Sequence, residues 1–164
     1  IYIAPDMLSN STLPPKFAAF IEKNRKIEYV LFILILASIA FKEVSPSVGG
    51  QVLVLLLSLL SVFYYAVSYI KQEVEQAWFK FFHRLVFLSL TIGVTGVLFL
   101  LQHWPGALIM ASGGMLGIIF GVGFALYCMQ TNARDKVYSM RLLASTLFVL
   151  VLFVLGVISQ THAA

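Results

Sequence analysis

Charged residues are scarce in this sequence of 164 residues. Asp, Glu, Lys and Arg make up 11% of the chain, against about 25% in an average soluble domain, and 60% of the residues are hydrophobic. This composition excludes a disordered chain, and the single cysteine, Cys128, excludes a scaffold held by internal disulfides. The sequence therefore predicts an integral membrane protein, whose first partners are membrane lipids.

Residues that carry chemistry are missing from the apolar stretches. The Asp and Glu residues all fall in loops or at interfaces, and the histidines fall at membrane edges, His83 on one side and His103 and His162 on the other. The sequence contains no Gly-rich phosphate loop and no nucleophile elbow. Because a catalytic or metal centre needs several reactive groups in one place, we expect no enzyme, no metal and no cofactor, apart from structural lipids.

Five apolar stretches follow one another along the chain, and they predict an all-α bundle of five transmembrane helices. A helix needs roughly 20 residues to cross about 30 Å of hydrocarbon. The expected spans are about 27–44, 50–70, 84–102, 106–129 and 141–159. The first is short and crosses only if Lys26 and Lys42 snorkel outward; its alternative is a re-entrant or interfacial segment.

The Lys and Arg residues test this arrangement. With five spans, ten of the eleven basic residues fall on one side of the membrane, and Lys42 is the exception. The positive-inside rule then places the N-terminus in the cytoplasm and the C-terminus outside. The net charge of +4 is thus accounted for by basic residues on the cytoplasmic side of the membrane, and we expect no nucleic-acid partner.

The remaining segments organise around one membrane domain. Residues 1–15 predict an extended N-terminal tail, and residues 16–164 a single transmembrane domain made of two helical hairpins and a fifth helix. Residues 71–84 are amphipathic, and Trp78, Lys80 and Arg84 suit a membrane-surface anchor; the alternative is an extension of the neighbouring spans. Because the chain begins at Ile1 without a methionine, we expect either a removed presequence or a start upstream.

The densest local motif is the turn His103-Trp104-Pro105-Gly106 between the third and fourth spans. There the hairpin of residues 97–115 resembles the His-Trp-Pro-Gly hairpin of the two-span motor subunit of the gliding-motility and type IX secretion apparatus of Bacteroidota. The matching residues are Leu98, Phe99, His103, Trp104, Pro105, Gly106, Ala107, Met110, Gly114 and Met115. That family carries a membrane-embedded glutamate on the following helix. Here residues 107–130 contain no acidic residue, so the resemblance implies the hairpin and not proton-driven work.

Small residues recur every four positions on the fourth span, at Gly113, Gly117, Gly121 and Ala125. Such a stripe lets a neighbouring helix approach closely, which is how helices associate in lipid. The partner is either another span of this chain, for which Gly93 and Gly96 are candidates, or another protein.

By elimination, the sequence predicts a non-catalytic membrane subunit that packs against, anchors or assembles a larger complex of integral membrane proteins. The expected location is the bacterial inner membrane, as a multi-pass protein. Two alternatives stay open: a small homo-oligomeric transporter or channel, and an accessory component of gliding or type IX secretion machinery.

Overall fold

Five helices make up almost all of the described chain. The computed structural model describes residues 26–70, 77–131 and 136–161, and within those ranges it has no strand. The helices are α2 (Lys26–Val44), α3 (Pro46–Ser68), α4 (Ala77–Leu101), α5 (Ala107–Thr131) and α6 (Lys136–Thr161). The expected tail at residues 1–15 lies outside the described residues. The all-α prediction is confirmed.

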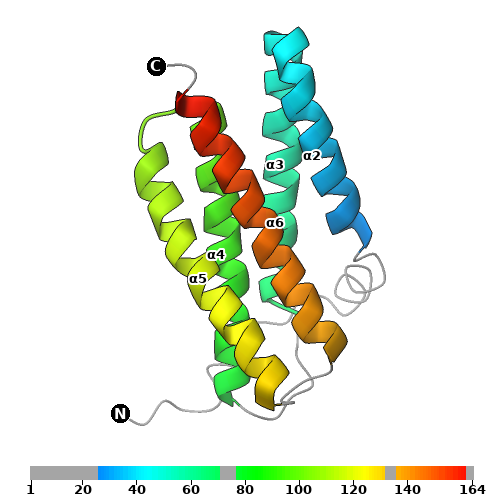
Figure 1. The fold of residues 1–164 in the computed structure, drawn as a ribbon, viewed down its shortest axis with the longest axis vertical. Coiled ribbons are helices and arrows are strands. Elements are labelled where there is room, and N and C mark those ends of the chain that lie inside the picture. The colour runs from blue at the N-terminus through cyan, green and yellow to red at the C-terminus, as the bar shows by residue number, and fades with distance from the viewer. Residues whose placement is uncertain (1–25, 71–76, 132–135, 162–164) are drawn as a thin grey trace.

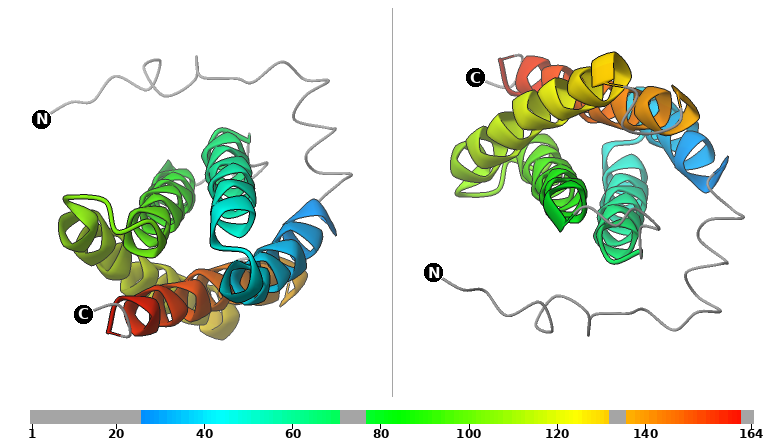
Figure 2. Two further views of the ribbon diagram at one scale, coloured as in Figure 1. Left: turned by 90° about the horizontal axis from the view of Figure 1, so that it is seen from above. Right: turned by 90° about the horizontal axis from the view of Figure 1, so that it is seen from below.

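Consecutive helices run antiparallel and pack in two layers. Figure 1 shows α2, α4 and α6 rising from one end of the bundle, and α3 and α5 descending toward it. We call this end the basic end, because Lys26, Lys80, Arg84 and Arg141 lie there, and the opposite end the turn end. Seen along the bundle, α5, α6 and α2 form one row that covers α3 and α4 (Figure 2). Fully buried Leu57, Leu90 and Leu152 belong to the apolar core.

Four of the helices are long and apolar enough to cross a membrane. They are α3, α4, α5 and, within α6, residues Tyr138–Ser159. This is the length and composition of a multi-pass membrane protein. Helix α2 is not among the four, because every stretch of 18 residues in it carries at least three of the charged residues Lys26, Glu28, Lys42 and Glu43. The five-span arrangement and its orientation therefore stay predictions.

The helices extend past the expected spans where the side chains turn polar. Helix α3 begins at Pro46 instead of residue 50, since proline suits the first turn, where its missing N–H leaves no bond unmade. Helix α4 begins at Ala77 instead of residue 84, so Trp78, Lys80 and Arg84 belong to the first turns of α4 and not to a separate surface helix. The rest of that amphipathic segment, residues 71–76, lies outside the described residues.

Candidate functional site: a polar network at the basic end

A carboxylate and a buried tyrosine meet inside the basic end of the bundle. Glu28, in the first turn of α2, is half-buried, and its Oε1 accepts a hydrogen bond of 2.7 Å from the hydroxyl of Tyr64 on α3. Tyr64 has no exposed surface. The Ser145 hydroxyl of α6 donates to the Arg141 carbonyl of its own helix at 3.0 Å. Hydrogen bonds to an ionised group are the stronger ones, so the contact between Tyr64 and Glu28 joins α2 and α3.

A histidine makes the second half of the network. His83 on α4 is 2% exposed, and its Nδ1 lies 2.6 Å from the hydroxyl of Tyr138 on α6. Its Nε2 faces the Val67 carbonyl of α3 at 3.4 Å. The carbonyl can only accept, so Nε2 carries a proton, and in the neutral imidazole Nδ1 then accepts from the Tyr138 hydroxyl. Interhelical hydrogen bonds in membranes contribute about 0.6–2 kcal/mol each, so the network also stabilises the bundle.

A cavity of about 220 Å³ lies beside these groups. Its lining combines one carboxylate, two cationic side chains, two hydroxyls with hydrogen-bonding partners, and aromatic and apolar walls. The lining residues are Lys26, Glu28, Tyr29, Phe63, Val67, Phe87, Tyr138, Arg141, Leu142 and Ser145. In chemical terms the cavity suits a small group that carries both signs of charge. Among the described residues, no three His, Cys, Asp or Glu side chains come close enough together to hold a metal ion.

Sequence reasoning missed this cavity. The sequence places Glu28 and His83 at the membrane edge, with His83 just before its expected span. The structure places His83 well inside α4, buried against α3 and α6. The available signal was that Glu28, Tyr64, His83 and Tyr138 all fall near the basic ends of their spans. Nothing in the sequence shows that those four ends converge.

The small-residue stripe of α5 packs inside the bundle. A Cβ added at Gly117 would overlap the Ser89 side chain of α4, and one at Gly121 would lie 2.6 Å from Cγ2 of Thr146 on α6. Ala125 is fully buried. Gly113 needs a correction: it is exposed, with Cγ2 of Ile92 its nearest neighbour at 4.0 Å from an added Cβ.

Gly114 takes the place expected for Gly113. A Cβ at Gly114 would overlap Cα of Gly93, and one at Gly96 would lie 2.8 Å from the Ala111 backbone nitrogen. The buried face of α5 therefore follows Gly114, Gly117, Gly121 and Ala125, because a strict four-residue spacing drifts by about 40° per step around a helix of 3.6 residues per turn. Helix α4 of the same chain is the partner at Gly114 and Gly117, and α6 also contacts Gly121.

The His-Trp-Pro-Gly turn terminates α4. His103 has the left-handed φ of 56°, and its N–H bonds to the Leu100 carbonyl, while the Trp104 N–H bonds to the Phe99 carbonyl at 2.9 Å. The Trp104 ring packs edge-on against Phe99 with centroids 5.2 Å apart. These bonds and the hydrophobic contact define a Schellman motif. Pro105 and Gly106, the latter with φ of 82°, lead into α5.

The two hairpins are joined at the turn end. Lys42 Nζ donates a 2.6 Å hydrogen bond to the Leu101 carbonyl, which the end of α4 leaves without a helical partner. Gln102 Nε2 donates to the Gly50 carbonyl at 3.0 Å. The turn residues thus have a structural use that accounts for the motif without a ligand.

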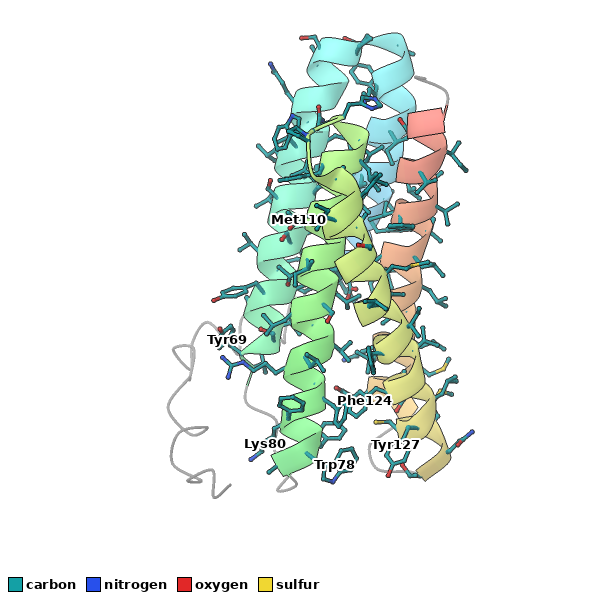
Figure 3. The ribbon with its side chains drawn as sticks, turned by 90° about the vertical axis from the view of Figure 1, so that its left-hand side faces the viewer. Tyr69, Trp78, Lys80, Met110, Phe124 and Tyr127 are labelled. Carbon is teal, nitrogen blue, oxygen red and sulfur yellow. The ribbon has the colours of Figure 1, made fainter. Side chains whose placement is uncertain are left out.

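An apolar groove lies on the outer surface of α4 and α5 at the basic end. It has a volume of about 430 Å³ and is lined by Trp78, Phe82, Ile119, Phe120, Gly123, Phe124 and Tyr127. Figure 3 shows the labelled Trp78, Phe124 and Tyr127 close together at the ends of the two helices. Trp78 makes edge-on ring contacts with Phe82, Phe124 and Tyr127. These contacts hold the walls of the groove in place.

The other two anchor residues point elsewhere. Lys80 is exposed and lies on the far side of α4 from the groove (Figure 3). The Arg84 guanidinium lies 4.3 Å above the Tyr69 ring. Tyr69 also accepts a hydrogen bond of 3.2 Å from the Tyr65 hydroxyl, and this bond together with Arg84 lowers the pKa of Tyr69.

No protein-family model, curated protein or solved structure matches this chain.

Proposed function

We propose that the chain is a non-catalytic integral membrane subunit that binds a transmembrane helix of a larger complex in the α4/α5 groove. The observation that carries the proposal is Gly123, which faces outward between aromatic walls. A Cβ at Gly123 would meet nothing within 4 Å, so the glycine serves no packing need inside the chain. Small residues at a helix surface allow a second helix to approach closely in lipid.

The walls of the groove suit a protein ligand. Trp78 and Tyr127 are 38% and 47% exposed, yet their rings are held 5.7 Å apart between centroids in an edge-on contact. Rigid aromatic side chains dominate association energies, because they bury much area and lose little conformational entropy. The occupant that fits is a helix with a bulky apolar side chain opposite Gly123.

The test is affinity purification of the full chain from native membranes in mild detergent, with Gly123→Leu compared with Gly113→Leu. Both glycines are exposed on α5, but only Gly123 lines the groove. We expect a stoichiometric membrane-protein partner with the wild type and with Gly113→Leu, and its loss with Gly123→Leu. A chain that purifies without a partner, or a partner that both variants retain, contradicts the proposal.

We also propose that α2 crosses the membrane, giving five spans with the basic end in the cytoplasm of a bacterial cell. The support is the packing of α2: Ile35 is fully buried, while Val30, Ile33 and Leu34 on its outer face are 46–65% exposed and need an apolar solvent. In a background lacking Cys128, a membrane-impermeant thiol reagent should label Ser47→Cys in intact cells and Lys80→Cys only after permeabilisation. Labelling in the reverse order would overturn the orientation.

A further inference from the structure

Hydroxyl groups line the contact between α3 and α4 partway between the two ends of the bundle. The Ser61 hydroxyl of α3 lies 3.2 Å from the Thr95 hydroxyl and 3.5 Å from the Thr91 carbonyl of α4. Ser58 lies one helical turn from Ser61, on the same side of α3, and is exposed. We call Ser58, Ser61, Thr91 and Thr95 the hydroxyl seam. We propose that this seam is the interface between two copies of the chain.

The hydroxyl seam lies on an outer face of the bundle. The row of α5, α6 and α2 covers one side of α3 and α4, and no described helix covers the opposite side (Figure 2). Next to the seam, Val62 of α3 and Ile92 of α4 are exposed. The seam is therefore a polar strip within an apolar face, at a depth where α3 and α4 have the composition of membrane spans.

The Ser58 hydroxyl needs a partner from outside the chain. Thr91 and Thr95 each donate to the carbonyl four residues earlier in α4, at 2.9 Å. Ser112, exposed on α5, donates to the Ile109 carbonyl of its own helix at 2.9 Å. Among the described residues, the Ser58 hydroxyl has no hydrogen-bonding partner. Lipid chains offer it none, and an unmade hydrogen bond in hydrocarbon is costly.

A second copy of the chain supplies that partner. Copies of a membrane protein insert with the same orientation, so two copies pair about a twofold axis perpendicular to the membrane, and residues near the axis meet their own equivalents. A hydroxyl both donates and accepts, so Ser58 can bond to its own copy. Lys80 and Arg84 of α4 lie about 16 and 10 Å from Thr91 toward the basic end, where water screens the repulsion between like charges.

Disulfide crosslinking in native membranes tests the interface. In a background with Cys128→Ala, oxidation should link Ser58→Cys into a product of twice the mass of the chain, because a disulfide needs two Cα atoms within about 7 Å. The matched control is Ile33→Cys on the exposed face of α2. Ile33 lies 11 residues before the end of α2 and Ser58 lies 12 residues after the start of α3, so both are at a similar distance from the turn end. Equal crosslinking of the two variants, or none with Ser58→Cys, overturns the proposal.

The purified full chain gives an independent measurement. Its dimerisation in lipid vesicles is followed by energy transfer between two labelled populations, over a range of protein-to-lipid ratios. Ser58→Ala removes two hydroxyls from each dimer and should raise the dissociation constant about tenfold, the effect of one or two interhelical hydrogen bonds. Ser112→Ala removes an exposed hydroxyl from α5 and should leave it unchanged. A wild-type chain that stays monomeric at every ratio, or an unchanged dissociation constant for Ser58→Ala, refutes the proposal.

The two assays also separate a second copy from other occupants of the seam. A crosslinked product of Ser58→Cys whose mass is not twice that of the chain would show a different protein there and would overturn the assignment. Phe82 in the groove and Thr91 in the seam are nine residues apart on α4, which is two and a half turns, so the two surfaces lie on opposite sides of that helix. The vesicle assay uses the purified chain alone, and its failure is therefore distinct from failure of the proposed helix docking.

Discussion

Replacing Gly114 by alanine should push α4 and α5 apart. The new Cβ would overlap Cα of Gly93 and would lie 2.8 Å from the Gly93 nitrogen and 3.5 Å from the Ile92 carbonyl carbon. Non-bonded heavy atoms sit best at about 3.5–4.0 Å. Since all three neighbours are backbone atoms, no side-chain rotation relieves the overlap, and the two helices must separate by about 1 Å to reach that distance.

The magnitude follows from two opposing terms. Overpacking a well-packed contact costs about 1–3 kcal/mol, and the upper end applies because the obstacle is backbone. Alanine regains up to about 1 kcal/mol of helix propensity over glycine. The expected net loss in the free energy of unfolding is therefore about 2 kcal/mol, which corresponds to a fall in Tm of about 4–8 °C for a chain of this size.

The adjacent residue is the matched control. Gly113→Ala makes the same chemical change one position earlier on the same helix, where an added Cβ would meet only Cγ2 of Ile92, at the ordinary contact distance of 4.0 Å. It should leave Tm unchanged or raise it slightly. The assay is the fraction of detergent-solubilised chain that stays monodisperse on size exclusion after heating. Equal midpoints for the two variants, or a lower one for Gly113→Ala, would refute the glycine contact between α4 and α5.

Three further substitutions test individual interactions. His103→Gly should raise Tm, because glycine adopts the left-handed φ of 56° without the cost of about 1 kcal/mol that a side chain adds. A lower Tm would contradict the view that His103 serves only to end α4. Tyr64→Phe should lower the stability in the same heating assay by about 1–3 kcal/mol, because Glu28 loses the hydrogen bond that the Tyr64 hydroxyl donates. No change would mean that the contact contributes nothing. The hydrogen bond from Tyr65 and, after it, the Arg84 guanidinium lower the pKa of Tyr69, so Arg84→Gln should raise this pKa, measured by ultraviolet absorbance titration. An unshifted titration would show that Arg84 does not contribute.

Local sequence signals predicted the helices well and the residues at which they begin less well. The apolar runs located the helices, and the His103–Gly106 turn located the end of α4 and the start of α5, whereas α3 begins at Pro46, four residues before the expected start. The expected spans at 84 and 141 begin seven and five residues after the starts of α4 and α6, which are Ala77 and Lys136. Hydrophobicity marks the part of a helix that is in lipid, whereas backbone hydrogen bonding continues beyond it through polar residues such as Lys80 and Arg84.

The candidate site depended on pairings that no local pattern carries. Glu28 and Tyr64 are 36 residues apart, and His83 and Tyr138 are 55 residues apart. Each residue alone is ordinary near the end of a span. They form a polar network only because four helix ends converge around one cavity. There polar groups must bond to one another, because lipid and apolar side chains offer no hydrogen-bonding partners.

The helical, membrane-compatible character of the chain was already contained in its apolar runs, because hydrocarbon admits a backbone only when its hydrogen bonds are closed within each segment. The apolar runs did not determine how each helix is rotated about its own axis. Gly113 and Gly114 are equally small and adjacent, yet Gly114 alone contacts Gly93. One residue step turns a helix by about 100°, and the rotation with the best packing depends on every neighbouring helix at once.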